Sequence, residues 1–425
     1  MPPLGNAFPP SLKITKPDLS FRDSRIDALP APRFLPATVD PLAEPPDRRL
    51  FLKAMAFPCA AACVIALARN SFALSTESWG GAGEDDSRYR VEARFYEKLP
   101  DKMVRCKLCP RECVVSPGSR GYCRVRENRN GTYYTLVHSR IVSAHIDPIE
   151  KKPFFHFLPG HMAFSVATAG CNVNCKFCQN WEISQARPED LPAQFVPPTE
   201  LAVLAAQNHC PVVSFTYSEP TVFNEYVTDS AEAMRDAGLK SVVVTNGFIQ
   251  QPPLKRVCQR ADAIKIDLKA FSEDYYRNVV NGKLQPILDT LVTIRKQNRW
   301  LEIVYLTVPT LNDRENEIRD MSRWIKAELG PDVPIHFTRF HPLYLLKNLP
   351  PTPVEILERC KAVADAEGLH YVYIGNVPGH PAENTYCPKC HKLVIERAGF
   401  TVTQMNLHKG KCQNCQNPIP GVWEA

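Results

Sequence analysis

The chain has 425 residues, of which 44% are hydrophobic and 23% are charged. These proportions are typical of a soluble globular protein, and the length allows one large domain with appendages or two to three ordinary domains. The net charge of +6 is mildly basic. Because no long run of basic residues interleaved with aromatic residues occurs, nucleic acid is not an expected partner.

The 16 cysteines are many for this length, and eleven of them fall within three short segments, 106–123, 171–178 and 387–415. Spacings of two or three residues between neighbouring cysteines favour metal ligation in a reducing compartment over a disulfide framework. Three other cysteines lie singly in apolar segments and are predicted to be buried free thiols: Cys210, Cys258 and Cys360.

The first 100 residues divide into three segments. Residues 1–47 are rich in proline and lack periodicity, so we expect them to be disordered. Residues 48–74 begin with Arg48 and Arg49 and continue with roughly fifteen apolar residues, which resembles a twin-arginine export signal. The alternative is an apolar segment with a chance arginine pair. That stretch is short for a membrane-spanning helix, and no other segment is long and apolar enough to be one. Residues 75–100 form a polar linker.

Residues 101–160 form a small unit rich in cysteine. Four of its cysteines close one short loop: Cys106, Cys109, Cys113 and Cys123. Four thiolates at this spacing fit either a tetrahedral zinc ion or an iron–sulfur cluster, and the spacing does not choose between them. The unit ends with DPIEKKPFFHFLPG (147–160), a predicted charged hairpin that its phenylalanines anchor to the following domain. Within it, His156 either lines a substrate mouth or packs in the interior.

Between residues 161 and 380, short apolar segments alternate with helix-like segments. Strands are expected at residues 163–169, 212–217, 241–246, 263–269, 301–308, 335–340 and 371–377. Several helix-like segments end on glycine, for example on Gly238, which fits a helix C-cap. Repeated strand–helix units of this length predict an α/β fold with a parallel sheet, in the form of a partial or full TIM-type barrel.

Polar residues follow the expected strands at the end where such barrels carry their chemistry. They are Cys171 after the first strand, Ser218 and Glu219 after the second, Thr245 and Asn246 at the third, Asp267 and Lys269 at the fourth, and His341 after the sixth. Since the carboxyl ends of parallel strands meet at one edge, these side chains are expected to surround a common site.

Three cysteines, Cys171, Cys175 and Cys178, stand in the loop after the first expected strand. Three thiolates on one tight loop can hold three irons of a [4Fe–4S] cluster, and the fourth iron then keeps an open position. An open position is typical of a catalytic metal centre, because structural sites use four protein ligands. The alternative is a zinc knuckle that takes its fourth ligand, for example a histidine, from elsewhere in the chain.

Cys171, Cys175, Phe177 and Cys178 resemble the signature of the radical S-adenosylmethionine (SAM) enzymes. The resemblance implies that the barrel is a radical SAM core, whose open iron is chelated by the amino and carboxylate groups of SAM. It also implies that an electron from the cluster cleaves SAM, and that the 5′-deoxyadenosyl radical so formed abstracts hydrogen from a substrate. The sequence does not identify that substrate.

The resemblance also suggests which residues bind SAM. Ser218 and Glu219 stand where the family usually has a Gly-Gly-Glu turn; the glycines are missing, but both side chains can accept a hydrogen bond from the SAM ammonium. The pyruvate formate-lyase-activating-enzyme branch of the family resembles this segment.

Two further pairs complete the implied SAM site. Asp267 and Lys269 match an acidic-x-basic motif of the same branch, which implies contact with the ribose or carboxylate of SAM. Thr245 and Asn246 are predicted to contact the ribose or the methionine part.

Residues 381–425 form a second unit rich in cysteine. Two C-x2-C pairs, Cys387 with Cys390 and Cys412 with Cys415, are separated by 21 residues. This arrangement is typical of a zinc ribbon with a structural role, and the alternative is a redox role of the rubredoxin type.

Three features together are similar to the radical SAM enzyme of the AmmeMemoRadiSam system, a relative of the glycyl-radical activating enzymes. They are the Cys106–Cys123 unit, residues 147–160, and QNWEISQ directly after Cys178. The resemblance covers residues 101–425. It implies a low-potential electron donor of the flavodoxin or ferredoxin type as a partner, together with a protein substrate or the other components of that system.

Three functions fit these features. The first is a radical SAM enzyme acting on an unidentified substrate, the second is an activase that generates a glycyl radical on a partner protein, and the third is a non-enzymatic interaction module holding several zinc ions. Because SAM and low-potential electron donors are cytosolic, we expect a cytoplasmic protein. Export or membrane association through residues 48–74 is the alternative.

Overall fold

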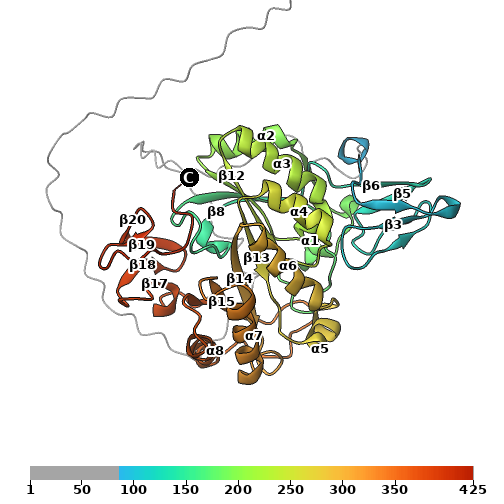
Figure 1. The fold of residues 1–425 in the computed structure, drawn as a ribbon. Helices are drawn as coiled ribbons and strands as arrows, with labels where there is room; N and C mark the ends of the chain where they lie inside the picture. The colour runs from blue at the N-terminus through green and yellow to red at the C-terminus, as the bar shows by residue number, and fades with distance from the viewer. Residues whose placement is uncertain (1–85, 425) are drawn as a thin grey trace, which may run out of the picture. The chain divides into compact units, whose positions relative to one another are not determined.

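The structure, a computed structural model, describes residues 86–424. The predictions for residues 1–47, for residues 48–74 and for residues 75–85 of the linker therefore lie outside the described residues. The centre of the fold is an eight-stranded sheet in the order β16-β15-β14-β13-β12-β11-β9-β8 (Figure 1). Neighbouring strands from β9 to β16 are parallel, whereas β8 is antiparallel to β9.

The seven parallel strands are those expected from the sequence, with boundaries within two residues of the expected ones. They are β9 (Met162–Ala167), β11 (Val212–Phe215), β12 (Lys240–Thr245), β13 (Ala263–Asp267), β14 (Trp300–Thr307), β15 (Ile335–Arg339) and β16 (Val372–Gly375). Their apolar residues are buried, for example Phe215 and Ile303, each with 0% exposure. Burial of one such side chain contributes about 1.5–3 kcal/mol, so the continuous apolar runs that predicted these strands also stabilise the sheet.

Helices connect successive parallel strands and cover the outer side of the sheet (Figure 1). They are α2 (Pro198–Gln207), α3 (Asn224–Asp236), α4 (Gln251–Arg260), α6 (Gln285–Lys296), α7 (Glu315–Glu328) and α8 (Val354–Ala366), with the short α1 (Trp181–Ser184) and α5 (Glu273–Tyr275) in loops. The predicted glycine cap of α3 is confirmed: Gly238 follows the helix with a φ of 74°, a conformation that a residue without Cβ adopts at low cost.

The barrel is partial. Among residues 86–424, the two edge strands of the main sheet, β8 (Ser143–Pro148) and β16, do not pair with each other, so the full barrel that was the second expectation does not form. The chain enters the C-terminal unit after β16 and adds no further strand–helix pair. Strand β8 was not expected from the sequence, which assigned these residues to the cysteine-rich unit. Its one large apolar residue, Ile146, is 41% exposed, so the segment lacks a hydrophobic pattern.

The cysteine-rich unit before the barrel consists of two small antiparallel sheets. One contains β1 (Val91–Glu92), β6 (Thr132–Thr135) and β5 (Arg126–Arg129), and the other contains β2 (Tyr96–Lys98), β3 (Val104–Cys106) and β4 (Val114–Val115). Two further strands pair nearby, β7 (Arg140–Ile141) and β10 (Gln194–Phe195). The core of the unit is small, with Val104 and Tyr133 fully buried. A buried ion pair between Arg126 of β5 and Glu225 of α3 attaches it to the barrel.

The C-terminal unit packs against the segment 149–160. Its strands are β17 (Thr385–Tyr386), β18 (Leu393–Ala398), β19 (Thr401–Met405), β20 (Leu407–His408) and β21 (Lys411–Cys412). Arg397 donates to the backbone oxygen of Phe155 over 2.8 Å. His156 is fully buried and bonds the Tyr373 hydroxyl at 2.6 Å and the Pro420 carbonyl at 2.7 Å. Of the two roles considered for His156, the structure shows the packed one.

The longest helix of the described chain is α7, with 14 residues. A helix needs about 20 residues to cross the hydrocarbon core of a bilayer. Within residues 86–424, therefore, no helix combines the length and the apolar character needed to cross a membrane.

Candidate active site

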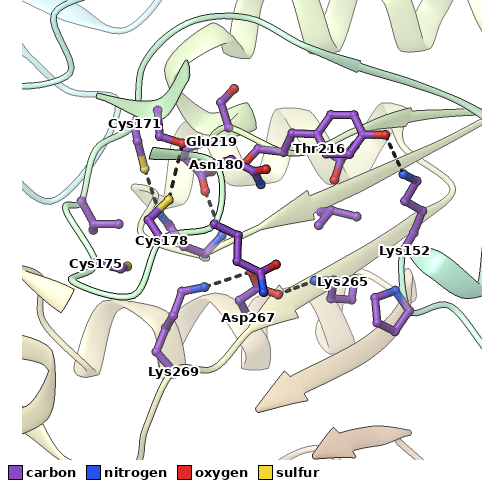
Figure 2. Close-up of a pocket in the computed structure, with 18 of the residues that line it drawn as sticks. Lys152, Cys171, Cys175, Cys178, Asn180, Thr216, Glu219, Lys265, Asp267 and Lys269 are labelled. Atoms are coloured by element: carbon purple, nitrogen blue, oxygen red, sulfur yellow. Dashed lines mark hydrogen bonds and ion pairs between the residues drawn. The ribbon is translucent and has the colours of Figure 1, made fainter. Parts of the chain in front are cut away.

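A cavity of about 510 Å³ lies at the carboxyl ends of the parallel strands (Figure 2). Its lining includes eight of the side chains predicted for the site: Cys171, Cys175, Cys178, Ser218, Glu219, Asn246, Asp267 and Lys269. An adjoining lobe of about 280 Å³ is lined in addition by Phe177, Val304 and Leu306. The strand ends thus bring together residues that are almost 100 positions apart in the sequence. His341 is exposed and is not among the described residues that line either lobe.

The cysteine loop follows β9 and begins at Gly170. Any other residue at this position would displace neighbouring atoms. Gly170 has a φ of 96°, and a Cβ there would lie 2.6 Å from a methyl group of Val125 and 2.9 Å from the Cys123 carbonyl oxygen. The cysteine-rich N-terminal unit therefore packs directly behind the loop. The backbone N–H of Asn174 donates to Val280 over 3.1 Å, which fixes the loop from the other side.

Of the three cysteines of the loop, Cys175 is buried, and Cys171 and Cys178 are half-buried. Burial raises the pKa of Cys171 and of Cys178, and it raises the pKa of Cys175 to about 12 although Lys269 acts in the opposite direction. Thiols with raised pKa values stay protonated at neutral pH unless a metal ion stabilises the thiolate. The loop is thus suited to ligate a metal and unsuited to act as a free nucleophile.

Glu219 is the buried carboxylate beside the cysteines. Its oxygens accept hydrogen bonds from the backbone N–H groups of Thr221 (2.9 Å) and Asn246 (2.8 Å) and from the hydroxyl of Thr245. Burial raises its pKa, and the hydrogen bond from Asn246 opposes that shift. A carboxylate held in this way can accept a further hydrogen bond from a ligand ammonium.

Thr245 and Asn246 support neighbouring residues of the site. Thr245 does not line the cavity among the described residues, and its hydroxyl donates to Glu219. The side-chain amide of Asn246 donates to Asn172 Oδ1 over 2.9 Å and lies 3.9 Å from Cys171 Sγ. The structure thus places Thr245 against the carboxylate and Asn246 against the cysteine loop.

Asp267 lies between two lysines across the cavity from the cysteines (Figure 2). Lys269 Nζ is 2.9 Å from the carboxylate, and Lys265 forms an ion pair with its other oxygen. Burial would raise the pKa of Asp267, but the two lysines outweigh burial and lower it. Asp267 therefore remains ionised at neutral pH.

Ser218 contributes a buried hydroxyl at the edge of this space. It lines the cavity with 8% exposure, and its hydroxyl has no hydrogen-bond partner among residues 86–424. A buried hydroxyl without a partner costs about 1–3 kcal/mol, so the site fits a ligand that supplies a polar group there.

Sequence reasoning missed several polar residues that line the cavity, among them Lys151, Lys152, Asn180, Tyr217 and Lys265. Lys265 was not predicted because a single lysine inside an apolar strand belongs to no recognisable binding motif. Lys152 belongs to DPIEKKP, which carries a charge pattern but no known ligand spacing. Asn180 and Tyr217 touch each other through a 2.9 Å hydrogen bond from the Asn180 amide to the Tyr217 carbonyl.

Comparison with known proteins decides the family. The model of the radical SAM superfamily matches residues 165–322, which contain the cysteine loop and β11 to β14. An uncharacterized protein of Methanocaldococcus jannaschii, MJ0808, is 44% identical over 330 residues, which cover 77% of this chain and 98% of that protein. The chain belongs to the radical SAM superfamily. As a radical SAM enzyme it is not the zinc-holding interaction module considered from the sequence.

Several solved structures match parts of the chain at low sequence identity. A domain of pyruvate-formate lyase-activating enzyme from Bacteroides vulgatus is 18% identical, with 39% of this chain and 98% of that chain covered and a TM-score of 0.35. SuiB of Streptococcus suis bound to S-adenosylmethionine is 11% identical, with coverages of 57% and 56% and a TM-score of 0.41. QueE of Escherichia coli is 13% identical, with coverages of 56% and 93% and a TM-score of 0.34.

Membership in the radical SAM superfamily implies a [4Fe–4S] cluster and SAM as cofactors. The residues present fit both groups, because three cysteines of one loop and Ser218, whose buried hydroxyl has no partner among residues 86–424, line the same cavity. The described lining of the cavity contains no further cysteine and no histidine, so a zinc knuckle would find no fourth ligand of these kinds there.

The C-terminal cysteines form a second candidate metal site. The sulfurs of Cys387 and Cys415 are 3.6 Å apart, and those of Cys390 and Cys412 are 3.8 Å apart. Four thiolates about 2.3 Å from a tetrahedral zinc lie about 3.8 Å from one another. Among residues 86–424, these four are the only set of three or more cysteine, histidine or carboxylate ligand atoms that all lie within 4.8 Å of one another.

Proposed function

We propose that Cys171, Cys175 and Cys178 hold a [4Fe–4S] cluster whose fourth iron binds SAM, and that the enzyme uses SAM to abstract hydrogen from a substrate in the same cavity. The observation that carries this proposal is that the three thiols of one loop open into a single cavity shared with Ser218, Glu219 and the Asp267 ion pairs. When bound, the cluster and SAM supply the electron and the radical.

The chain's own residues bind and orient SAM. Glu219 offers a carboxylate for the SAM ammonium, and Ser218 offers a hydroxyl. Asp267 either accepts hydrogen bonds from a ribose or holds Lys269 in place. Burial alone would lower the pKa of Lys269, but the charge of Asp267 outweighs burial and raises it. Phe177 packs beside Lys269, whose ammonium lies 5.9 Å from the ring centre. These groups hold SAM with its reactive end toward the cysteines.

An anaerobic assay of 5′-deoxyadenosine formation tests this function. The wild-type chain, reconstituted with iron and sulfide and given SAM and a reductant, should form 5′-deoxyadenosine. Cys175→Ala should abolish the product while circular dichroism stays unchanged, since the loop loses one iron ligand and not the fold. Cys360→Ala is the matched control, because Cys360 is a buried thiol of α8 far from the cavity lining. Product formation by Cys175→Ala at the wild-type rate would contradict the cluster assignment.

We further propose that the enzyme is the radical SAM component of an AmmeMemoRadiSam system. Support comes from the Cys106–Cys123 unit, from residues 147–160 and from QNWEISQ after Cys178. The chemistry requires a low-potential electron donor and SAM, and we therefore place the protein in the cytoplasm. Co-purification of a second component of that system with the full chain would test the assignment.

We propose zinc for the C-terminal site, on the sulfur separations of 3.6 and 3.8 Å. For Cys106, Cys109, Cys113 and Cys123 the sequence left zinc and an iron–sulfur cluster open. The sulfurs of these four cysteines do not all lie within 4.8 Å of one another, as those of the C-terminal four do. We therefore favour the cluster, because its cysteine ligands bind separate irons and lie farther apart than the ligands of one zinc ion. Zinc and iron counts of a chain in which Cys171, Cys175 and Cys178 are replaced distinguish the two.

A further inference from the structure

Four lysines line the cavity: Lys151, Lys152, Lys265 and Lys269. Two aspartates accompany them, and each is shared between two lysines. Asp147 pairs with Lys151 at 2.7 Å and with Lys152, and Asp267 pairs with Lys269 at 2.9 Å and with Lys265. Glu219, which lines the cavity together with Asp267, forms no ion pair with a lysine among the described residues.

Lys152 is the most enclosed of these lysines. Its side chain is 2% exposed, and its ammonium also contacts the Tyr217 hydroxyl at 3.1 Å and lies 4.5 Å from the centre of the Tyr217 ring. Lys265 is similarly enclosed, with a side chain that is 5% exposed. In Figure 2, Lys152 and Lys265 lie on the side of the cavity opposite the three cysteines. The charge of these two lysines therefore lies away from the three cysteines that we expect to hold the cluster.

The four ammonium groups exceed the three carboxylates of Asp147, Asp267 and Glu219 by one positive charge, and those of Lys152 and Lys265 are largely buried. A buried charge is costly unless an opposite charge compensates it. SAM would not supply the compensation, because its sulfonium is itself positive and its carboxylate would be held at the cluster in the proposed function. An anionic group bound beside Lys152 would supply it.

We propose that Lys151, Lys152 and Lys265 bind a carboxylate or phosphate group of the substrate, so that the substrate is an anionic small molecule. The inference rests on the proposed function, since it takes the cavity as the place where hydrogen is abstracted. It assigns a role to DPIEKKP: Asp147 is the second-last residue of β8, and the turn after Pro148 places both lysines at the cavity. Burial lowers the pKa of Lys152 to about 8 against the opposing effect of Asp147, as expected for an ammonium that lacks a full complement of negative charge.

Titration calorimetry on the reconstituted full chain with SAM present tests the site. The probes are pyrophosphate for a phosphate group, citrate for a carboxylate group, and glycerol as an uncharged control. We expect one anion to bind once per chain, with an affinity that falls at least tenfold in Lys152→Gln and at least threefold in Lys151→Gln. Lys151 has a side chain that is 49% exposed, so its replacement tests the site even where Lys152→Gln does not fold.

Lys255→Gln is the matched control, because Lys255 is an exposed lysine on α4 and should leave anion affinity unchanged. Binding of neither anion, or equal affinities in the wild type and both cavity variants, would overturn the anionic site. Formation of 5′-deoxyadenosine by the same wild-type sample is measured in parallel. Product without anion binding overturns this inference alone and favours an uncharged substrate such as a glycine of a partner protein. Anion binding without product overturns the proposed function and leaves an anion-binding cavity.

Discussion

At the scale of single residues, Glu219 shows how a strand-end carboxylate is held ready for a ligand. Three donors of the chain occupy part of its oxygens, two of them backbone N–H groups at 2.8 and 2.9 Å. Hydrogen bonds to charged groups contribute about 1.5–3 kcal/mol each. Loss of the hydrogen bond that the SAM ammonium donates to Glu219 should therefore lower the affinity for SAM by about tenfold.

Replacement of Glu219 by glutamine tests this role. Glu219→Gln keeps the size of the side chain and removes its charge, so we expect a SAM dissociation constant about tenfold higher than that of the wild type. Equilibrium dialysis against labelled SAM measures it. Glu232→Gln on the surface of α3, where the side chain is 57% exposed, serves as the control. Equal SAM affinities in the wild type and in Glu219→Gln would show that the carboxylate does not contact SAM.

The pKa of Lys152 gives the anionic site a defined pH dependence. The groups that face its ammonium are Asp147 and Tyr217, with Lys151 and Lys265 as further charges. Burial would raise the pKa of Asp147, but hydrogen bonds from the lysines lower it, so this carboxylate stays ionised above neutral pH. Burial raises the pKa of Tyr217, which keeps its hydroxyl neutral. The lysines are therefore the groups that titrate there as pH rises.

Anion affinity should then be full below the Lys152 pKa of about 8 and should be lost as pH rises through it. Only the protonated lysine attracts an anion, so linkage predicts about a tenfold loss of affinity between about pH 7 and about pH 9. Calorimetry with the anion that binds measures the profile. In Lys152→Gln the remaining affinity should change less over the same range, and an unchanged steep profile in that variant would assign the titration to another group.

At the scale of elements, the N-terminal unit is attached to the barrel by a fully buried ion pair. Arg126 of β5 and Glu225 of α3 both have side chains with 0% exposure, and Glu225 also accepts from the backbone N–H of Arg94 over 3.0 Å. Removal of one partner of such a pair leaves an uncompensated buried charge. This contact holds the unit behind the cysteine loop, where Gly170 meets Cys123.

Arg126→Met should therefore lower the free energy of unfolding by about 3–5 kcal/mol. Urea denaturation measures the loss. The double variant Arg126→Met/Glu225→Gln should recover a large part of it, because no charge then remains buried. Arg129→Met, at a residue whose side chain is 44% exposed, should change stability by less than about 1 kcal/mol. A loss of similar size in both single variants would contradict the special role of the buried pair.

The C-terminal unit contributes to the wall of the cavity. Phe400, in the turn between β18 and β19, lines both lobes. A hydrogen bond from the backbone N–H of Lys392 lowers the pKa of Cys390 to about 6, which favours the thiolate form that binds metal ions. Ligation of zinc by the four cysteines would fix the hairpin that carries Phe400.

Cys415→Ser should therefore lower the zinc content by one ion per chain and leave the iron content unchanged. Amide hydrogen exchange should become faster in β17, β18 and β19, since a structural zinc site stabilises the fold around it. Metal analysis and exchange mass spectrometry check the two effects. A loss of iron in this variant would assign the C-terminal site to an iron centre of the rubredoxin type.

At the scale of the whole molecule, the sequence predicted the parts whose pattern is local. The seven parallel strands are apolar runs, and the spacing of the cysteines marks the loop that the structure places at the cavity. Strand β8 was missed because SAHIDP lacks alternation, and its pairing depends on the edge of β9. Lys152 and Lys265 were missed as site residues because only the tertiary fold brings the turn after β8 beside β13. Spacing likewise does not show that the C-terminal sulfurs converge more closely than those of Cys106–Cys123.

The most direct test of the central claim is the electron paramagnetic resonance of the reduced, reconstituted chain before and after addition of SAM with an isotope-labelled carboxylate. A three-cysteine loop that leaves one iron open predicts a changed spectrum and a magnetic coupling between the labelled carboxylate and the cluster. The same coupling should be absent in Cys175→Ala. A wild-type spectrum that SAM does not change, or a protein that binds zinc and no iron, would contradict the account.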